Sequence, residues 1–164
     1  MPNILSHGKV IDDHWILLSD EDAIPAQGDI IVPLSTWAAQ REVLLAREGA
    51  VSVLLDGQDE VETIADDLAH FAMIAIHFAK FVDGRGFSSA RLLRDRYHYQ
   101  GNIRAIGHII RDQLFLMKRC GFSEFSFSAE IDLHAAAESL NVFSDSYQTA
   151  ADTAEPLFRR RRLA

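Results

Sequence analysis

Cysteine is nearly absent from this 164-residue sequence, which contains Cys120 alone. A single cysteine excludes a disulfide within the chain, and it excludes zinc or iron–sulfur sites built from four cysteines. Long hydrophobic runs are also missing, since none approaches the roughly 18–20 residues that span a bilayer. The first residues lack a basic start followed by an apolar stretch, so we expect no signal peptide. The sequence predicts a soluble, cytoplasmic protein that does not bind membranes.

Positive charge is scarce in the first half of the chain. Residues 1–79 carry 3 basic and 14 acidic side chains, a net charge of −11, whereas residues 80–119 carry 9 and 3, a net charge of +6. Residues 120–164 carry 4 and 7, and all four of those positive charges lie in Arg159–Arg162. An acidic protein with a net charge of −8 therefore holds one basic segment. We expect the terminal arginines to form a solvated tail and predict no nucleic-acid binding.

The length and apolar content indicate one folded domain. Hydrophobic residues make up 48% of the chain, which excludes disorder of the whole sequence. A complete eight-unit β/α barrel needs roughly 250 residues and is excluded. We expect a single α/β domain over residues 1–164, with residues 1–28 as a variable N-terminal segment and residues 141–164 as an extended C-terminal tail.

Short β-branched runs alternate with helical spacings along most of the chain, as in parallel βαβ units. Ser35 or Thr36 is the expected cap of the first helix, Gly49 and Gly121 are expected helix stops, and the apolar run 15–18 is either an edge strand or a flap. The predicted strands are 29–34, 50–55, 73–79, 102–106 and 125–127, and the predicted helices are 38–48, 59–71, 88–97, 112–119 and 132–140.

The expected fold class is α/β, with a mostly parallel sheet of about five strands flanked by helices. The strands at 50–55 and 73–79 are nearly continuous apolar runs, which suits burial on both sheet faces. We therefore expect an open sheet with helices on both faces. The alternative is a half-barrel of β/α units that closes by dimerisation.

The segment from Phe78 to Arg91 combines glycines with charged side chains just after the third predicted strand. Ligands of open parallel sheets bind outside such strand ends. Two glycines let backbone N–H groups approach a ligand, and a serine-capped helix start favours an oxyanion. The candidate ligand-binding residues in this segment are Lys80, Asp83, Gly84, Arg85, Gly86, Ser88 (with Ser89 as the other possible cap) and Arg91. The alternative interpretation is an ordinary glycine-rich turn with solvated charges.

The end of the next predicted strand repeats this pattern. Arg104 lies inside the strand, where an unpaired charge is costly, so it must face solvent or pair with a carboxylate or ligand. His108, Arg111 and Asp112 surround the following helix start and complete the candidate ligand-binding set. The alternatives are a structural or surface role for His108 and a helix-capping role for Asp112. If the sheet is parallel, both loops share one rim.

Signatures of catalysis and of cofactor binding are weak. The segment is not a Walker loop, because the Gly-Lys-Ser/Thr ending is missing, and it lacks the three spaced glycines of a dinucleotide fingerprint. Cys120 is either a buried, inert thiol or a redox-active one. The histidines show no metal-ligand spacing, so we predict no metal site. The sequence leaves the catalytic residues and any flavin or nicotinamide cofactor unknown.

Several motifs together resemble a bacterial family named domain of unknown function 934. The matching stretches are Phe81-Val82-Asp83-Gly84-Arg85-Gly86-Phe87-Ser88, Ala90-Arg91-Leu92-Leu93-Arg94, Arg104-Ala105-Ile106-Gly107, Arg111-Asp112-Gln113-Leu114 and Arg119-Cys120-Gly121-Phe122, with parts of the segment from Tyr147 to Arg159. The sequence departs from the family pattern at Ala79 and His108, where proline and aspartate are expected. The change at His108 argues against a required carboxylate at that position.

The resemblance implies a role in sulfite reduction and cysteine biosynthesis, because family members are labelled as oxidoreductases of that pathway. Our first hypothesis is an accessory protein whose basic rim binds a small oxyanion or an acidic redox partner, such as sulfite reductase or another sulfur-assimilation protein. The second hypothesis is an oxidoreductase acting in sulfite reduction. The third is a non-catalytic structural or dimerisation protein, in which carboxylates from the acidic first half engage Arg85 and Arg104.

Overall fold

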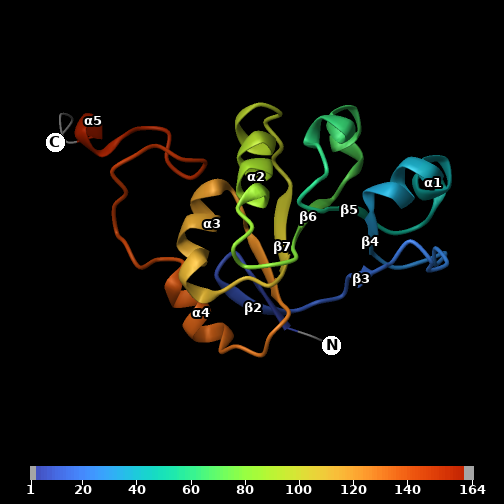
Figure 1. Ribbon diagram of the computed structural model, residues 1–164, viewed down its shortest axis with the longest axis horizontal. Helices are drawn as coiled ribbons and strands as arrows, with labels where there is room; N and C mark the ends of the chain where they lie inside the picture. Colours follow the sequence, from blue (N-terminus) through green and yellow to red (C-terminus); the bar gives the residue numbers. More distant parts are fainter. Residues whose placement is uncertain (1–2, 161–164) are drawn as a thin grey trace.

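A computed structural model describes residues 3–160 of the chain (Figure 1). Arg161 and Arg162, half of the expected solvated cluster, lie outside the described residues. The strands are β1 (Asn3–Ser6), β2 (Lys9–Asp12), β3 (Ile16–Leu17), β4 (Ile30–Pro33), β5 (Val51–Leu55), β6 (Met73–Phe78), β7 (Asn102–Gly107) and β8 (Glu124–Phe127). The helices are α1 (Leu34–Ala46), α2 (Arg85–Asp95), α3 (Leu114–Cys120), α4 (Leu133–Ser139) and α5 (Leu157–Arg160), with 3₁₀ helices η1 (Val61–His70) and η2 (Arg111–Gln113).

All eight strands of the described residues form one sheet in the order β2-β1-β8-β7-β6-β5-β4-β3. The strands from β3 to β8 are parallel, and each pairs with its neighbour in the sequence. The β1–β2 hairpin adds an antiparallel edge beside β8. The α/β class and the mostly parallel sheet are confirmed, but the sheet has eight strands rather than about five.

Helices cover only one face of this sheet. Consecutive parallel strands joined by right-handed crossovers place every connecting helix on the same side. The main core accordingly joins one sheet face to residues from all of the longer helices, such as Trp37, Ile64 and Leu93. The opposite face holds a second, smaller cluster, in which Ile31, Met73 and Ala75 pack without any helical residue. The expected helices on both faces are therefore wrong, and the half-barrel arrangement of the alternative is confirmed, while its closure by dimerisation stays a prediction.

A short strap, residues 13–15, shows how strongly the sheet curves. It connects β2 at one edge of the sheet to β3 at the other edge, and Figure 1 shows this blue segment crossing the molecule. Seven strand spacings would separate these edges by about 33 Å in a flat sheet. The four residue steps from Asp12 to Ile16 reach at most about 14 Å. The sheet must curl into a half-barrel, with the strap lying across its helix-free, concave face.

A buried ion-pair network fixes the strap to the concave face. Arg104, in the middle of β7, is 2% exposed and donates from Nε to Oε2 of Glu124 on β8 at 2.8 Å. Its Nη1 donates to both carboxylate oxygens of Asp13 in the strap, at 3.0 and 3.1 Å. The second oxygen of Glu124 accepts from Ser6 on β1 and Asn102 on β7. One guanidinium therefore joins the strap to the sheet next to its antiparallel edge.

Several local boundaries differ from the sequence prediction. The α1 helix begins at Leu34, so Ser35 and Thr36 lie inside it and donate their hydroxyls to Asp20 instead of capping it. Helix α2 begins at Arg85 rather than residue 88 and has no side-chain cap. The segment predicted as a helix at 59–71 adopts 3₁₀ geometry over Val61–His70. The run at 15–18 forms the edge strand β3, and Gly121 ends α3 as expected.

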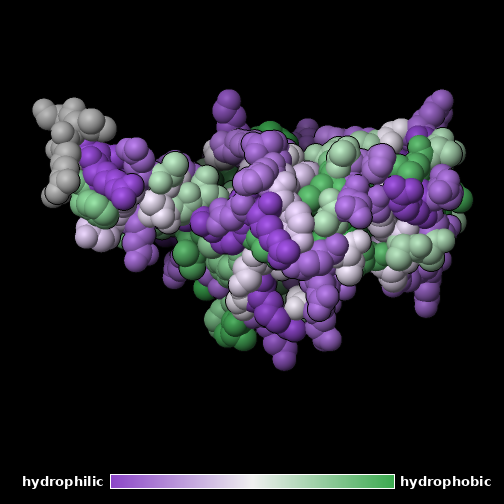
Figure 2. Space-filling view, turned by 90° about the horizontal axis from the view of Figure 1, so that it is seen from above, coloured by the Kyte–Doolittle hydropathy of each residue, from purple (hydrophilic) through white to green (hydrophobic). Residues whose placement is uncertain are grey.

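The C-terminal arm, residues 141–160, stands away from the body in Figures 1 and 2. Arg119 of α3 holds it by donating to the carbonyl oxygen of Gln148 at 2.5 Å and by approaching Asp152 at 3.7 Å. In the view of Figure 2 the surface is mostly hydrophilic, with hydrophobic residues in small separate groups. Within residues 3–160 no helix is long and apolar enough to cross a membrane.

We predict that Arg104→Met lowers the free energy of unfolding by about 3–5 kcal/mol, because it leaves Asp13 and Glu124 buried without a cation. Urea unfolding at neutral pH measures this loss. The matched control is Arg96→Met, whose ion pair with Glu62 is exposed and should leave the free energy of unfolding close to wild type. Equal effects of the two substitutions would contradict the structural role of the network.

Candidate functional site

The two loops singled out in the sequence meet at one rim, where the parallel strands end. The β6–α2 loop and the β7–α3 loop adjoin because β6 and β7 are parallel neighbours. The amide of His108 donates to the carbonyl oxygen of Phe78 at 2.8 Å. The side-chain amide of Gln113 donates to the carbonyl oxygen of Phe81 at 2.7 Å and accepts from the amide of Ile110 at 3.4 Å. The expectation of a shared rim is confirmed.

Asp83 and Arg85 form a closed ion pair within the first loop. Arg85 donates from Nε and Nη2 to the Asp83 carboxylate at 2.9 and 2.6 Å, and its backbone amide donates to the same carboxylate at 3.1 Å. These hydrogen bonds lower the pKa of Asp83 to about 2. An internal carboxylate thus already lies at the start of α2, where the sequence suggested an external anion.

The two glycines of this loop have different roles. A Cβ atom at Gly86 would lie 2.7 Å from Phe78 Cζ and 2.9 Å from Ile76 Cγ2, so only glycine fits beneath the helix start. At Gly84 nothing lies within 4 Å of that position. Gly107 at the end of β7 has a φ of +111°, and its Cβ would lie 2.6 Å from the Phe78 carbonyl oxygen. The required glycines support packing against β6 rather than the approach of a ligand.

An aromatic cluster underlies the same loop. Phe78 of β6 packs edge-on against Phe87 of α2 with ring centroids 5.6 Å apart. Phe122, just after α3, contacts both rings at 5.8 and 6.4 Å. The pairs among Phe78, Phe87 and Phe122 join three elements behind the rim and fix the position of its loops.

The remaining candidate residues of the rim are exposed. Ser88 forms no side-chain hydrogen bond within residues 3–160, and neither Asp112 nor His108 forms an ion pair or side-chain hydrogen bond there. The expected capping role of Asp112 is wrong, because α3 has Gln113 at its N-cap position. Lys80 and Arg111 are exposed, and no ion pair among the described residues includes either of them.

Two predicted arginines lie away from the rim. Arg104 is buried halfway along β7 in the network with Asp13 and Glu124. Arg91 pairs with Asp95 on α2 at 2.5 Å and faces a groove between the end of that helix and the C-terminal arm. Of the five cations assigned to a basic rim, only Lys80, Arg85 and Arg111 therefore lie in or next to the two rim loops.

An acidic groove that was not predicted from the sequence lies on the same edge of the sheet. It lies at the ends of β4, β5 and β6 and is lined by residues that include Asp20, Ser35, Asp56, Asp59 and His77. His77 Nδ1 lies 3.5 Å from an Asp56 oxygen. Strand alternation could have placed His77, the second-last residue of β6, on the concave face. Within the described chain no group of three histidine, cysteine or acidic residues could hold a metal ion.

Cys120 is partly buried at the end of α3. Burial raises the pKa of its thiol, an effect that the nearby Arg91 and Arg119 only partly oppose. A raised pKa reduces the thiolate fraction at neutral pH, and the thiolate is the reactive form. The structure therefore supports the inert interpretation of this cysteine over the redox-active one.

The two rim loops and the aromatic cluster lie in a part of the chain that matches a known bacterial family. Residues 52–158 match the model of a family described as "Bacterial protein of unknown function (DUF934)". The chain belongs to this family. Neither a search of curated proteins nor a search of solved structures found a match to the chain.

The DUF934 match covers the rim, the aromatic cluster and most of the C-terminal arm, but it begins only at Ser52 in β5. The hairpin, the strap and β4 lie before it, so Asp13 is outside the matched region while its partner Arg104 is inside. Several motif residues of the DUF934 resemblance have packing roles in this structure. Arg94 donates to the carbonyl oxygens of Gly101 and Gly121, both at 2.9 Å, and a Cβ at Gly121 would lie 2.5 Å from Arg94 Cγ.

We predict that Gly86→Ala destabilises this DUF934 protein by about 1–3 kcal/mol, because the added methyl group overlaps the Phe78 ring. Gly84→Ala is the matched control two residues away. It should change stability by less than about 0.5 kcal/mol, since its Cβ meets open space. Thermal or urea unfolding of both variants distinguishes them, and a loss at Gly84 as large as at Gly86 would contradict the packing argument.

We also predict slow modification of Cys120 by a thiol-specific disulfide reagent at pH 7.5. The rate should be at least tenfold lower in the folded protein than in urea, because burial restricts access and raises the thiol pKa. Absorbance of the released thiolate follows the reaction. Modification as fast as that of the unfolded chain would instead indicate a reactive cysteine.

Proposed function

We propose that this DUF934 protein is an accessory protein of assimilatory sulfite reduction that docks onto an acidic surface of a redox partner. The docking surface is the rim patch, defined as Lys80, Phe81 and Val82 of the β6–α2 loop with Ile110 and Arg111 of the β7–α3 loop. Its supporting observation is that two adjoining loops carry three exposed apolar side chains together with two exposed cations that have no ion-pair partner in the described chain.

The apolar part of the rim patch is well exposed. Phe81 is 52% exposed, Val82 71% and Ile110 42%. The Gln113 amide links Phe81 to Ile110, so the two loops present their apolar side chains from a fixed frame. Interfaces between proteins commonly surround a few aromatic and aliphatic anchors with polar residues. Three anchors suit a small, transient interface of the kind that redox partners form.

The charges of the rim patch favour an acidic partner. Lys80 directly precedes Phe81 in the chain and Arg111 directly follows Ile110, and none of the ion pairs in residues 3–160 includes either cation. Positive charge that is not neutralised internally steers association with a negative surface and sets its salt dependence. The sulfite-reduction labels of the family make sulfite reductase, or another sulfur-assimilation protein, the partner to test.

The ion pairs make a protein partner a better candidate than a small oxyanion. An oxyanion site needs several donors that converge without competing carboxylates. Here Asp83 holds Arg85, Asp95 holds Arg91, and two carboxylates hold Arg104. Calorimetric titration with sulfite and sulfate provides the comparison, and tight binding of either anion would favour the oxyanion form of the proposal.

We predict that Lys80→Glu with Arg111→Glu, and separately Phe81→Ser with Val82→Ser, each weaken binding to sulfite reductase at least tenfold. The first pair reverses the charges that face the partner, and the second removes apolar anchors. Surface plasmon resonance at two salt concentrations measures both effects, and the charge-reversal variant should also lose the salt dependence.

The matched control is Lys9→Glu, which reverses an exposed charge on the edge strand β2, outside the rim patch. It should bind like the wild-type protein. Binding that the rim variants leave unchanged would contradict this docking surface, and absence of binding to sulfite reductase by the wild-type chain would contradict the proposed partner.

A further inference from the structure

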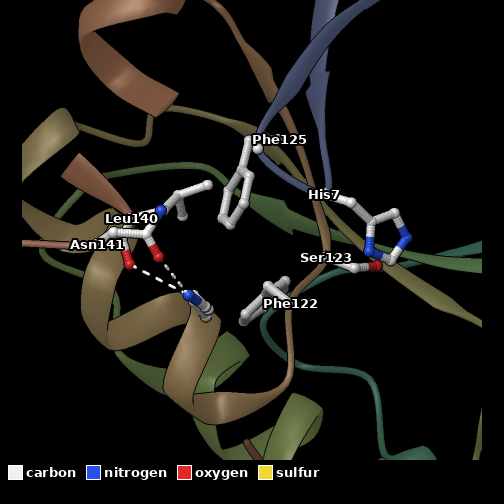
Figure 3. A pocket seen from close by; sticks show the side chains of 8 residues that line it. His7, Phe122, Ser123, Phe125, Leu140 and Asn141 are labelled. Atoms are coloured by element: carbon white, nitrogen blue, oxygen red, sulfur yellow. Dashed lines mark hydrogen bonds between the residues drawn. The ribbon is translucent and has the colours of Figure 1, made fainter. Parts of the chain in front are cut away.

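A cavity near the start of β8, away from the rim patch, combines apolar walls with a cation. Figure 3 shows it from close by, between the β1–β2 turn, the end of α3 and the end of α4. Its volume is about 250 Å³. The lining residues are His7, Gly8, Lys118, Phe122, Ser123, Phe125, Leu140 and Asn141.

The walls of this cavity are apolar and well ordered by the core. Phe122, Phe125 and Leu140 are 3%, 1% and 4% exposed, and all three belong to the main hydrophobic core. Their side chains surround the opening in Figure 3. A cavity with such walls binds the apolar body of a ligand through buried area and dispersion contacts.

The polar end of the cavity is built around Lys118. Its ammonium group donates to Asn141 Oδ1 at 2.7 Å and to the carbonyl oxygen of Leu140 at 3.4 Å, as the dashed lines in Figure 3 show. No ion pair among residues 3–160 includes Lys118. An ammonium has three donors, so one N–H remains for a ligand. Because Asn141 accepts through its oxygen, its NH₂ group supplies further donors beside the cation.

The turn at the cavity mouth has an unusual composition. His7 and Gly8 join β1 to β2 with φ values of +48° and +78°, the left-handed geometry of a two-residue hairpin turn. Asparagine is the ordinary first residue of such a turn, because most side chains are strained there. Here the first residue is His7, and its ring Nε2 hydrogen-bonds to Asn102 Oδ1 at 3.0 Å. Glycine suits position 8 because of its positive φ, and a Cβ there would lie at an ordinary contact distance of 3.9 Å from Leu140 Cδ1.

We propose that this cavity binds a small carboxylate with a compact apolar body, such as one aromatic ring. The carboxylate would accept hydrogen bonds from Lys118 and Asn141, while the ring would contact Phe122, Phe125 and Leu140. An anion is expected because no carboxylate among residues 3–160 pairs with the Lys118 ammonium, and a compact body is expected because the cavity volume is below the roughly 300 Å³ of drug-sized sites. This site is separate from the rim patch and does not depend on it.

The experiment is a titration of the full-length, isotope-labelled chain with benzoate, followed by amide chemical shifts. Benzyl alcohol and benzylammonium are the matched probes, because they keep the ring and replace the negative charge by none or by a positive one. We expect saturable shifts with benzoate at residues 7–8, 118–125 and 140–141, and at least tenfold weaker binding of both other probes. Equal binding of the three probes, shifts confined to other residues, or no saturable shift with benzoate would overturn the proposal.

Two variants assign the donors. Lys118→Met keeps the apolar stem and should weaken benzoate binding at least tenfold while leaving benzyl alcohol binding unchanged. Asn141→Ala removes the second donor at an exposed position and should weaken benzoate binding severalfold even if the first variant fails to fold. Lys9→Met removes a lysine charge outside the cavity and should have no effect. Benzoate binding that survives Asn141→Ala and any folded Lys118→Met protein without loss would overturn the assignment.

Discussion

The buried guanidinium of Arg104 is the interaction on which the rest of the structure depends. A charge that is 2% exposed is tolerated only when carboxylates and hydrogen bonds surround it, and here they come from β8 and from the strap. Asp13 can reach it only if the sheet curls enough for the strap to cross its concave face. Through Glu124 the same group is linked to Ser6, so the antiparallel hairpin is joined to the parallel strands at one polar centre. Curvature, strap and hairpin are therefore coupled through one side chain, whose polar bonding also specifies the register of β7 against β8.

Most of the chain's β/α order could be predicted from its sequence, because buried parallel strands are short apolar runs and their helices have a period near 3.6. The hairpin was missed because Ile4-Leu5 and Val10-Ile11 are very short runs, and the turn between them lacks the Asn-Gly signal. The prediction that helices cover both faces of the sheet was wrong for a different reason. Apolar residues on the concave face, such as Met73 and Ala75, are buried by the strap and by neighbouring strands rather than by helices. A continuous apolar strand therefore does not imply helices on both sides.

The candidate site was predictable in its position but not in its pairings. Sequence order places the two loops after neighbouring strands, and parallel strands bring those loops to one rim. Which cations remain available depends on side-chain contacts. Asp83 lies two residues from Arg85 and pairs with it, while Arg104 finds Asp13 at a distance of 91 residues in the chain. The role of Gly86 could not be predicted either. This glycine leaves room for the Phe78 ring, and a local motif does not reveal which side chain from elsewhere in the sequence will pack against it.

The concentrated positive charge of residues 80–119 is largely an internal feature of the fold. Five of its nine cations pair with carboxylates within the described chain, namely Arg85, Arg91, Arg96, Arg104 and Arg119. A sixth, Arg94, donates to the carbonyl oxygens of Tyr99, Gly101 and Gly121. The remaining three, Lys80, Arg111 and Lys118, have no ion-pair partner among residues 3–160, and they lie at opposite ends of the strands. Two adjoin exposed apolar residues in the rim loops, and the third lines a cavity whose other walls include Phe122, Phe125 and Leu140. A cation that has no ion-pair partner in the folded protein still attracts an anion. Where it lies beside apolar surface, the same ligand or partner can also make apolar contacts. Because of this coincidence, these two places are stronger binding candidates than the glycine-rich loop, whose own carboxylate already satisfies its arginine.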